Sequence, residues 1–256
     1  MYRPLTVTTL ALNYVLGEYE PFGYHLVNLF FHLANATLLW ILATRLGVAP
    51  RPAFAVALLF VVHPLGTEPV NYISSRSSLL TAFCYLLGFV FLARSHIGGV
   101  GWIASISACY LGGLASKAVA ASFPLVAASY LWGRSRAKNW QVPAVLLAIT
   151  ALYVAGTRAV VSKAMLEPVR PFGAQVATQL KAVVFYIWTV AMPVRQSVEP
   201  QFFVATGWVD GPVLLALAFL VTLAAVTIRV VPANHWIVLP TVWFFAALLP
   251  PSIVPL

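Results

Sequence analysis

Long apolar segments follow one another along almost the whole chain and are separated by short polar turns. Nine such segments carry few charges, at about 24–46, 53–71, 77–94, 100–116, 118–132, 141–160, 177–193, 211–231 and 235–253. Their lengths suit a helix that crosses a hydrocarbon core of roughly 30 Å, and none alternates as a β-strand does. We therefore predict an all-α fold, a polytopic transmembrane helical bundle of about nine spans.

Composition excludes a soluble globular domain. Of the 256 residues, 61% are hydrophobic and only 8% are charged, whereas about 25% of residues are charged in a typical soluble domain. The formal net charge of +9 would suggest nucleic acid in a soluble protein. Here the basic residues lie mostly between spans, where membrane topology and anionic lipid headgroups explain them. We expect membrane lipids as partners and no nucleic acid.

The first residues differ from the spans that follow. The stretch from Leu5 to Leu16 contains three threonines and Asn13, and it ends at a Gly-Glu-Tyr-Glu-Pro sequence. This pattern is typical of a helix that lies on the membrane surface. We predict an exoplasmic interfacial segment over 1–23 and a transmembrane helical domain over 24–256. No cleavable signal peptide is recognisable at the start of the sequence.

Basic residues in short loops indicate the orientation. Arg134, Arg136 and Lys138 lie within a loop of a few residues, where the positive-inside rule is strongest. We predict that this loop is cytoplasmic, which places the loops around 1–23, 63–76, 158–176 and 229–234 on the exoplasmic side. A bacterial inner membrane or an endoplasmic reticulum membrane fits this arrangement.

The first predicted span carries four polar residues on one face. His25, Asn28, His32 and Asn35 fall within about 80° of one another around a helix. Polar groups facing lipid are costly, so these should face other helices or a cavity. The two histidines are roughly 10 Å apart along the axis, too far to share one metal ion. We expect hydrogen bonds between helices and no metal.

Polar residues and prolines interrupt the apolar pattern from His63 to Arg76, in the sequence H-P-L-G-T-E-P-V-N-Y-I-S-S-R. Pro64 and Pro69 break the helical hydrogen-bond ladder and free carbonyl groups. Two interpretations stay open. The segment either lines a wet cavity at membrane depth, or forms a tight interfacial turn whose Arg76 reaches lipid headgroups.

Cations gather at the exoplasmic ends of the predicted spans. Lys117 lies between two apolar stretches and, with Arg76, Arg158, Lys163 and Arg170, can neutralise a lipid phosphate. Ordinary anchoring at the membrane interface is the alternative explanation.

Five motifs occur in a recognisable order. They are Y-R-P-L-T at 2–6, P-F-G-Y-H-L-V-N-L-F-F-H at 21–32, H-P-L-G-T-E-P-V at 63–70, L-A-S-K-A at 114–118 followed by P-L-V at 124–126, and W-F-F-A-A-L-L-P-P-S-I-V-P-L at 243–256. The chain resembles the membrane domain of the transmembrane, tetratricopeptide-containing O-mannosyltransferase-like proteins. These belong to the multi-span glycosyltransferases that use polyprenyl-phosphate sugars.

The resemblance implies transfer of a sugar, typically mannose, from a polyprenyl-phosphate donor to an acceptor hydroxyl. A carboxylate would position or deprotonate the acceptor, and cations would stabilise the departing phosphate. The positions that match family motifs are Arg3, His25, Asn28, His63, Glu68, Arg76 and Lys117. The resemblance implies that the cations among them, Arg3 included, are candidates to bind the lipid phosphate. Family members usually carry an acidic pair upstream of the Y-R-P-L motif, after a first span. This chain begins at that motif, so we expect it to lack both.

Glu68 is the candidate catalytic carboxylate, with Glu18 and Glu20 as the other acids near the expected site. The leading hypothesis is a glycosyltransferase-like membrane protein, related to polyprenyl-phosphate-mannose protein O-mannosyltransferases and truncated or inactive as written. The alternative is a non-catalytic subunit of a membrane protein complex that packs through the small residues at 112, 113 and 116. A transporter with spans broken at Pro64 and Pro124 is a third hypothesis.

Overall fold

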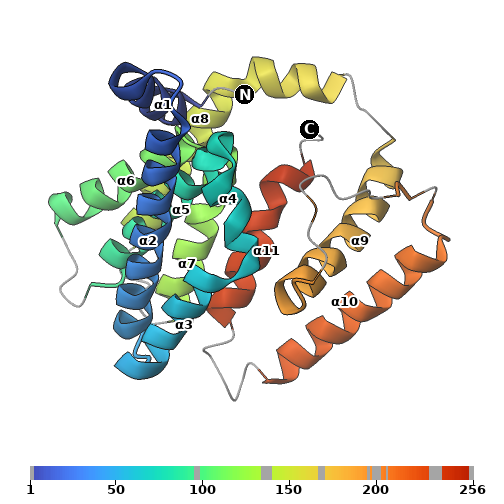
Figure 1. The fold of residues 1–256 in the computed structure, drawn as a ribbon. Coiled ribbons are helices and arrows are strands. Elements are labelled where there is room, and N and C mark those ends of the chain that lie inside the picture. Colours follow the sequence, from blue (N-terminus) through green and yellow to red (C-terminus); the bar gives the residue numbers. More distant parts are fainter. Residues whose placement is uncertain are drawn as a thin grey trace. The chain divides into compact units, whose positions relative to one another are not determined.

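A computed structural model describes residues 3–94, 99–133, 140–166, 171–194, 197, 203–205, 207–230 and 238–253. These residues form eleven α-helices and three short 3-10 helices, and the described ranges contain no strand (Figure 1). The predicted all-α class is therefore confirmed for this part of the chain. Contacts divide the chain into two compact units, residues 1–155 and 156–256.

The first unit contains seven complete α-helices and the beginning of an eighth. Its elements are α1 (Pro4–Gly17), α2 (Pro21–Arg45), α3 (Pro50–Val62), η1 (Pro64–Gly66), α4 (Thr67–Asn71), η2 (Ile73–Ser75), α5 (Arg76–Leu92), α6 (Val100–Leu114), η3 (Ala118–Ser122), α7 (Phe123–Gly133) and α8 (Gln141–Leu166), which continues into the second unit. Proline occupies the first turn of α1, α2 and α3, where its missing N–H removes no helical hydrogen bond. These prolines mark the beginnings of three helices in the sequence.

The second unit contains α9 (Phe172–Ala191), α10 (Gly211–Val230) and α11 (Val238–Ile253). Ala177 of α9 and Val213 of α10 are fully buried and form a small apolar core with Ala205. The backbone N–H of Ala205 donates a 3.0 Å hydrogen bond to the hydroxyl of Thr178. The segment between α9 and α10 is thereby tied to the first half of α9.

Four helical segments are long and apolar enough to cross a membrane: Pro21–Arg45, Ile73–Leu92, Gln141–Arg158 and Gly211–Arg229. A fifth candidate is α3 together with Pro64–Asn71, which are bent by 56° at the break between them. Three other apolar helices among the described residues are shorter than a full span. Every predicted segment thus contains helix, but the structure supports four or five spans, and the number nine stays a prediction.

α1 buries two polar side chains and exposes large apolar ones. Thr6 and Asn13 are buried, whereas Val15 is 79% exposed. At its start, the N–H of Leu5 donates a 3.1 Å hydrogen bond to the carbonyl of Ala115, just beyond the end of α6. The outward apolar face suits contact with lipid, and the interfacial position of α1 and the predicted division at residue 23 stay predictions.

α5 is largely buried and packs on α6 through small side chains. A Cβ added to Gly112 would lie 2.9 Å from the Sγ of Cys84, and one added to Gly113 would lie 3.0 Å from the Cβ of Ala120. Small residues of this kind let helix backbones approach closely in membranes. Gly113 and Ser116 are buried. The small residues that suggested a face for a partner protein are therefore used inside the first unit.

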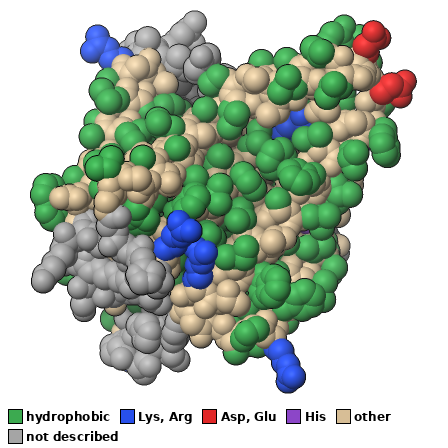
Figure 2. Space-filling view, turned by 90° about the vertical axis from the view of Figure 1, so that its left-hand side faces the viewer, with side chains coloured by type: hydrophobic (Ala, Val, Ile, Leu, Met, Phe, Trp, Pro, Cys, Tyr) green, Lys and Arg blue, Asp and Glu red, His purple; other side chains and the backbone are tan. Residues whose placement is uncertain are grey.

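Large apolar side chains cover much of the face seen in Figure 2. Along α2 alone, Phe22 is 75%, Leu26 53% and Phe30 63% exposed. Such a surface suits lipid rather than water as its solvent. Together with the apolar helices of spanning length, it identifies the chain as a membrane protein.

The fully buried side chain of Arg76 joins three helices of the first unit. Its Nε donates a 2.8 Å hydrogen bond to Asn28 Oδ1, and its Nη2 donates a 2.9 Å bond to the carbonyl of Tyr24. Its Nη1 donates to the carbonyl of Thr9 at 3.0 Å and to Asn13 Oδ1. The guanidinium also lies 5.7 Å from the ring centre of Tyr24. One cation at the start of α5 thereby holds α1 and α2.

We predict that Arg76→Met destabilises the protein by roughly 3–5 kcal/mol, because buried oxygens of Asn13 and Asn28 would lose a charged donor. Thermal unfolding of the purified protein in detergent measures the change. Arg76→Lys should rescue only part of the loss, since an ammonium group lacks the planar fork of a guanidinium. Exposed Arg51 supplies the matched control, Arg51→Met. Equal stability of Arg76→Met and this control would contradict the role of Arg76.

Candidate functional site

The polar stripe of α2 faces the broken connection that follows α3. A ring nitrogen of His25 lies 3.4 Å from the carbonyl oxygen of Val70, and Asn28 Nδ2 donates to the same oxygen at 3.4 Å. Nε2 of His32 lies 3.2 Å from the carbonyl oxygen of Val61. The stripe thus supplies hydrogen-bond partners to backbone carbonyls on both sides of the break.

His63 explains why the carbonyl of Val61 needs such a partner. In an uninterrupted helix the N–H of Leu65 would donate to that carbonyl. Here the N–H of Leu65 donates instead to Nδ1 of His63 at 3.2 Å, as Pro64 begins a 3-10 turn. His32 then occupies the place of the lost backbone donor, so two histidines together replace one helical hydrogen bond.

The rest of the stripe is also enclosed by protein. Asn28 and Asn35 are fully buried and His32 is 4% exposed. Nδ2 of Asn35 donates a 3.1 Å hydrogen bond to the carbonyl of Leu79 in α5. Within the described ranges, no three His, Cys, Asp or Glu side chains gather as metal ligands would. The arrangement is that of hydrogen bonding between helices, which the spacing of the stripe indicated.

Two cations meet beside the first turn of α5. Nη1 of Arg3, just before α1, donates a 3.3 Å hydrogen bond to Ser77 Oγ. Nζ of Lys117, between α6 and η3, donates a 3.0 Å bond to Ser78 Oγ. The charge of Arg3 acts on Lys117 and lowers its pKa, so segments more than a hundred residues apart in sequence bring two positive charges within electrostatic reach. We call Arg3, Lys117, Ser77 and Ser78 the Arg3–Lys117 site.

A carboxylate borders the Arg3–Lys117 site. Glu68, at the start of α4, is exposed, and its Oε1 accepts a 3.2 Å hydrogen bond from Ser75 Oγ. Its charge raises the pKa of Lys117, which shows that it lies within electrostatic reach of the ammonium group. The serine run on either side of Arg76 therefore arranges two cations and one carboxylate at a single helix start.

The positive charges of this site oppose each other in the absence of an anion. Burial of the half-buried Lys117 lowers its pKa, and the neighbouring charge of Arg3 lowers it further, more than Glu68 compensates. A bound anion would counteract this lowering of the pKa, because an opposite charge favours the protonated ammonium group. The geometry is therefore suited to binding a phosphate or another compact anion.

The other predicted phosphate ligands lie elsewhere. Arg76 is buried and donates to Asn13, Asn28 and two carbonyls, so we leave it out of the site. Arg158 is exposed on α8, beyond the boundary between the two units. The side chain of Lys163 and all of Arg170 lie outside the described residues.

The other candidate acids are remote from Arg3. Glu18 and Glu20 follow the far end of α1, which has 14 residues. At about 1.5 Å per residue, that helix places them roughly 20 Å from its start. Among the described carboxylates of the first unit, Glu68 alone borders the Arg3–Lys117 site.

Sequence reasoning did not identify the three serines that organise this site. Ser75, Ser77 and Ser78 each bond to one of the charged groups, and the run S-S-R-S-S was visible in the sequence. Dense hydroxyls at a helix start were a usable signal, because they bond to neighbouring groups where the helical ladder leaves donors free.

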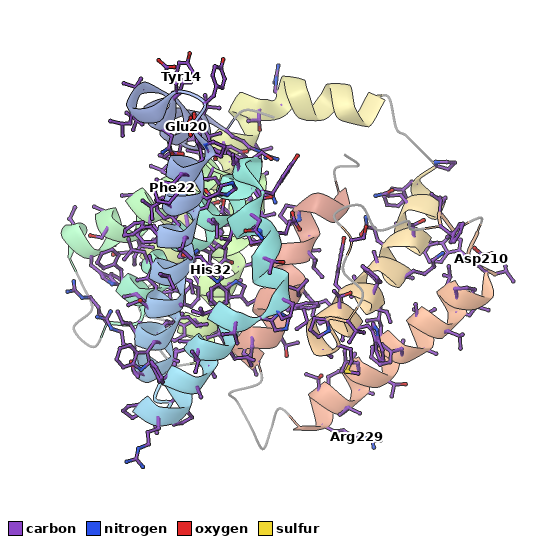
Figure 3. All side chains as sticks on the ribbon, viewed as in Figure 1. Tyr14, Glu20, Phe22, His32, Asp210 and Arg229 are labelled. Carbon is purple, nitrogen blue, oxygen red and sulfur yellow. The ribbon has the colours of Figure 1, made fainter. Side chains whose placement is uncertain are left out.

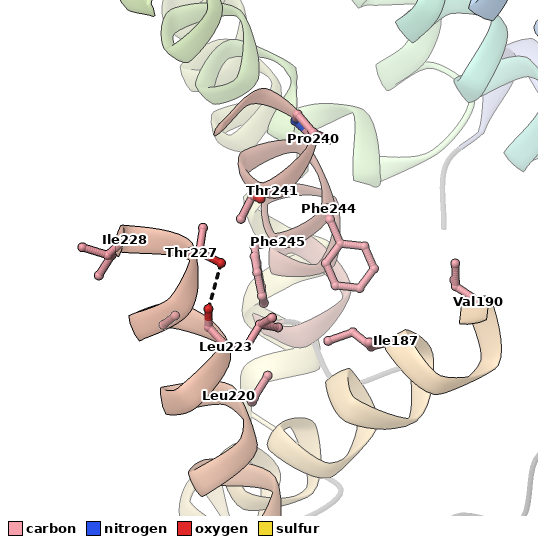
Figure 4. A pocket seen from close by; sticks show the side chains of 11 residues that line it. Ile187, Val190, Leu220, Leu223, Thr227, Ile228, Pro240, Thr241, Phe244 and Phe245 are labelled. Carbon is pink, nitrogen blue, oxygen red and sulfur yellow. Dashed lines mark hydrogen bonds between the residues drawn. The ribbon is translucent and has the colours of Figure 1, made fainter. Parts of the chain in front are cut away.

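An apolar cavity of about 700 Å³ lies in the second unit, between α9, α10 and α11 (Figure 4). Its lining includes Ile187 of α9, Leu223 of α10 and Phe244 of α11. Of its two threonines, Thr227 donates its hydroxyl to the carbonyl of Leu223 at 2.8 Å. The cavity offers apolar contact and no charged group among its lining residues, so it has no recognisable catalytic chemistry.

Comparison with known proteins relates part of the chain to a group of transferases. It is 42% identical over 115 residues to protein O-mannosyl-transferase Tmtc3 of Drosophila melanogaster, a match that covers 37% of this chain and 12% of that protein. It is 42% identical over 94 residues to protein O-mannosyl-transferase TMTC3 of Mus musculus, covering 37% and 10%. It is 39% identical over 103 residues to protein O-mannosyl-transferase TMTC4 of Homo sapiens, covering 35% and 14%.

Each of these matches spans less than a sixth of the relative's own length. No protein-family model and no solved structure matches the chain. The resemblance drawn from the five motifs is nevertheless confirmed for part of the chain. Over 35–37% of its length, the chain is similar to protein O-mannosyl-transferases of the TMTC group.

Proposed function

We propose that the chain is a glycosyltransferase-like membrane protein that binds the phosphate of a polyprenyl-phosphate sugar at the Arg3–Lys117 site. The observation that carries this proposal is the pair of cations held on the consecutive residues Ser77 and Ser78. The named activity of the relatives, protein O-mannosyl transfer, makes a mannose-bearing donor the first to test.

The chemistry of the pair fits a phosphate group. Guanidinium and ammonium groups form short, charge-assisted hydrogen bonds to phosphate oxygens, and a guanidinium can engage two oxygens at once. Two serine hydroxyls at the same place add neutral donors. Burial is the main cause of the lowered pKa of Lys117, and a phosphate between Arg3 and Lys117 would offset the added repulsion from Arg3.

Transfer needs more than binding, because an acceptor hydroxyl must be positioned and deprotonated. Glu68 is the described carboxylate beside the two cations, and it already accepts a hydrogen bond from Ser75. Among the described carboxylates of the first unit, no second one borders the Arg3–Lys117 site to share these two tasks with Glu68. We propose that this chain, by itself, binds the donor without transferring its sugar.

Lys117→Ala should weaken binding of a polyprenyl-phosphate mannose by roughly ten- to hundredfold, the usual effect of removing a hydrogen bond to a charged group. Arg3→Ala should weaken it to a similar extent. Binding of a fluorescent donor analogue to purified protein in detergent measures both. Arg229→Ala, which removes an exposed cation at the end of α10, is the matched control. Unchanged affinity in both site variants would refute the proposed site.

Lys117→Arg tests whether charge is the relevant property. Phosphate binds the protonated ammonium, so wild-type affinity should fall as pH rises through the lowered pKa of Lys117. A guanidinium stays protonated throughout that range, and Lys117→Arg should keep its affinity at alkaline pH. Identical alkaline loss in the two proteins would show that Lys117 does not hold the phosphate.

The proposed absence of transfer is tested with a polyprenyl-phosphate mannose and a peptide that contains serine and threonine. We expect no mannosylated peptide, because no second carboxylate among the described residues of the first unit lies beside Glu68. General-base assistance alone is typically worth about 10² to 10⁴ in rate. Product formed by the wild type and lost in Glu68→Gln, with donor binding preserved, would contradict the expectation and identify Glu68 as the base.

A further inference from the structure

The end of the first unit opposite α1 carries three exposed arginines. Arg45 ends α2, Arg51 is the second residue of α3, and Arg94 follows α5. The turn between α2 and α3 is short, so Arg45 and Arg51 emerge at the same end of the unit. We call Arg45, Arg51 and Arg94 the basic end.

Two of these arginines are held over the last turn of α5. Nη1 of Arg45 donates a 2.5 Å hydrogen bond to the carbonyl of Val90. The guanidinium of Arg94 lies 5.7 Å from the ring centre of Phe91. Both guanidinium groups therefore contact the last turn of α5 at this end of the unit. Like charges at one end of a unit favour an anion beside them.

No carboxylate of the first unit lies at the basic end. Its three acidic residues are Glu18, Glu20 and Glu68, and all are among the described residues. Glu18 and Glu20 lie in the turn between α1 and α2, and Glu68 bonds to Ser75 beside the start of α5. The counter-ion of the basic end must therefore come from outside this unit.

The exposed face of α2 indicates which length of the helix contacts the hydrocarbon core of the membrane. Phe22 and Trp40 are exposed, and Leu26, Phe30 and Leu33 continue the same apolar stripe between them. Figure 3 shows Phe22 and Glu20 near the α1 end of α2, with His32 further along the helix. The 18 helical steps from Phe22 to Trp40 correspond to about 27 Å along the axis, close to a hydrocarbon core of roughly 30 Å.

Aromatic side chains continue the boundary at the basic end. The ring of Trp40 meets that of Phe54 edge to face at 6.0 Å between centres. Nε1 of Trp102 donates a 2.8 Å hydrogen bond to the carbonyl of Phe91. Tryptophan is enriched where hydrocarbon gives way to headgroups, and the arginines lie just beyond this aromatic belt.

We infer that the basic end binds the headgroups of anionic phospholipids in the cytoplasmic leaflet of the membrane. Charge complementarity selects this occupant, because the arginines lie at headgroup depth and the cytoplasmic leaflet carries the negative lipids. The Glu18–Glu20 turn then lies on the exoplasmic side. The predicted cytoplasmic loop with Arg134, Arg136 and Lys138 lies outside the described residues, so this inference rests on different arginines.

The test is selective lipid retention by the full chain, reconstituted in nanodiscs with equal amounts of phosphatidylglycerol and phosphatidylcholine. Native mass spectrometry after release counts the bound lipids. The wild type should retain phosphatidylglycerol preferentially. In the double variant Arg51→Gln/Arg94→Gln, the ratio of retained phosphatidylglycerol to phosphatidylcholine should fall about fivefold for each charge removed. Arg229→Gln, on the second unit, should leave the preference unchanged.

Charge-conserving changes separate lipid binding from folding. Arg51→Lys/Arg94→Lys should keep most of the preference for phosphatidylglycerol, since an ammonium group also binds a phosphodiester. Equal retention of the two lipids by the wild type would overturn the inference. An effect of Arg229→Gln as large as that of the double variant would also overturn it.

Sidedness is tested by an impermeant thiol reagent applied to intact cells, with Cys84 and Cys109 replaced by alanine. Glu18→Cys should be modified from outside, and Arg51→Cys only after the cells are made permeable. Modification of Arg51→Cys in intact cells would place the basic end on the exoplasmic side and refute the inference.

Discussion

The buried guanidinium of Arg76 is the interaction on which the first unit depends. It opens α5, the most enclosed of the candidate spans, and donates to oxygens of α1 and α2. A cation is costly at this depth unless several acceptors surround it, and Asn13 and Asn28 supply two of them. The same contacts bring α1 across the start of α5, which places Arg3 beside Ser77. Thus the buried Arg76 positions the Arg3 guanidinium at the start of α5.

A second constraint is the break between α3 and α4. Prolines and the His63 side chain divert backbone donors, and the carbonyls left behind lie against the polar stripe of α2. Irregular backbone within an apolar bundle is tolerated when such partners exist. The break also sets α4 at an angle, which carries Glu68 toward the serines that precede and follow Arg76. Polar groups inside the bundle therefore serve mainly to shape the surface where Glu68, Arg3 and Lys117 meet.

Much of the fold was predictable, because each helix depends on features of its own segment of the sequence. Apolar length located the helices, and the 3.6-residue period put His25, Asn28, His32 and Asn35 on one enclosed face. The partners of that face are backbone carbonyls that a break elsewhere in the sequence leaves without helical donors. The sequence around the face contains no pattern that predicts them. The role of Arg76 was equally invisible, because a snorkelling arginine and a buried one have the same sequence. The pairing of Arg3 with Lys117 depends on contacts across more than a hundred residues, so only the folded chain reveals it.

The central claim is that Arg3 and Lys117, and not the buried Arg76, hold the phosphate of a lipid-linked sugar. An experimental structure of the full chain in lipid, with a non-hydrolysable polyprenyl-phosphate mannose analogue bound, tests it most directly. The account predicts phosphate density between the Arg3 guanidinium and the Lys117 ammonium group, with the Arg76 contacts to Asn13 and Asn28 intact. Phosphate bound to Arg76 after displacement of α1, or located away from both Arg3 and Lys117, would contradict the account.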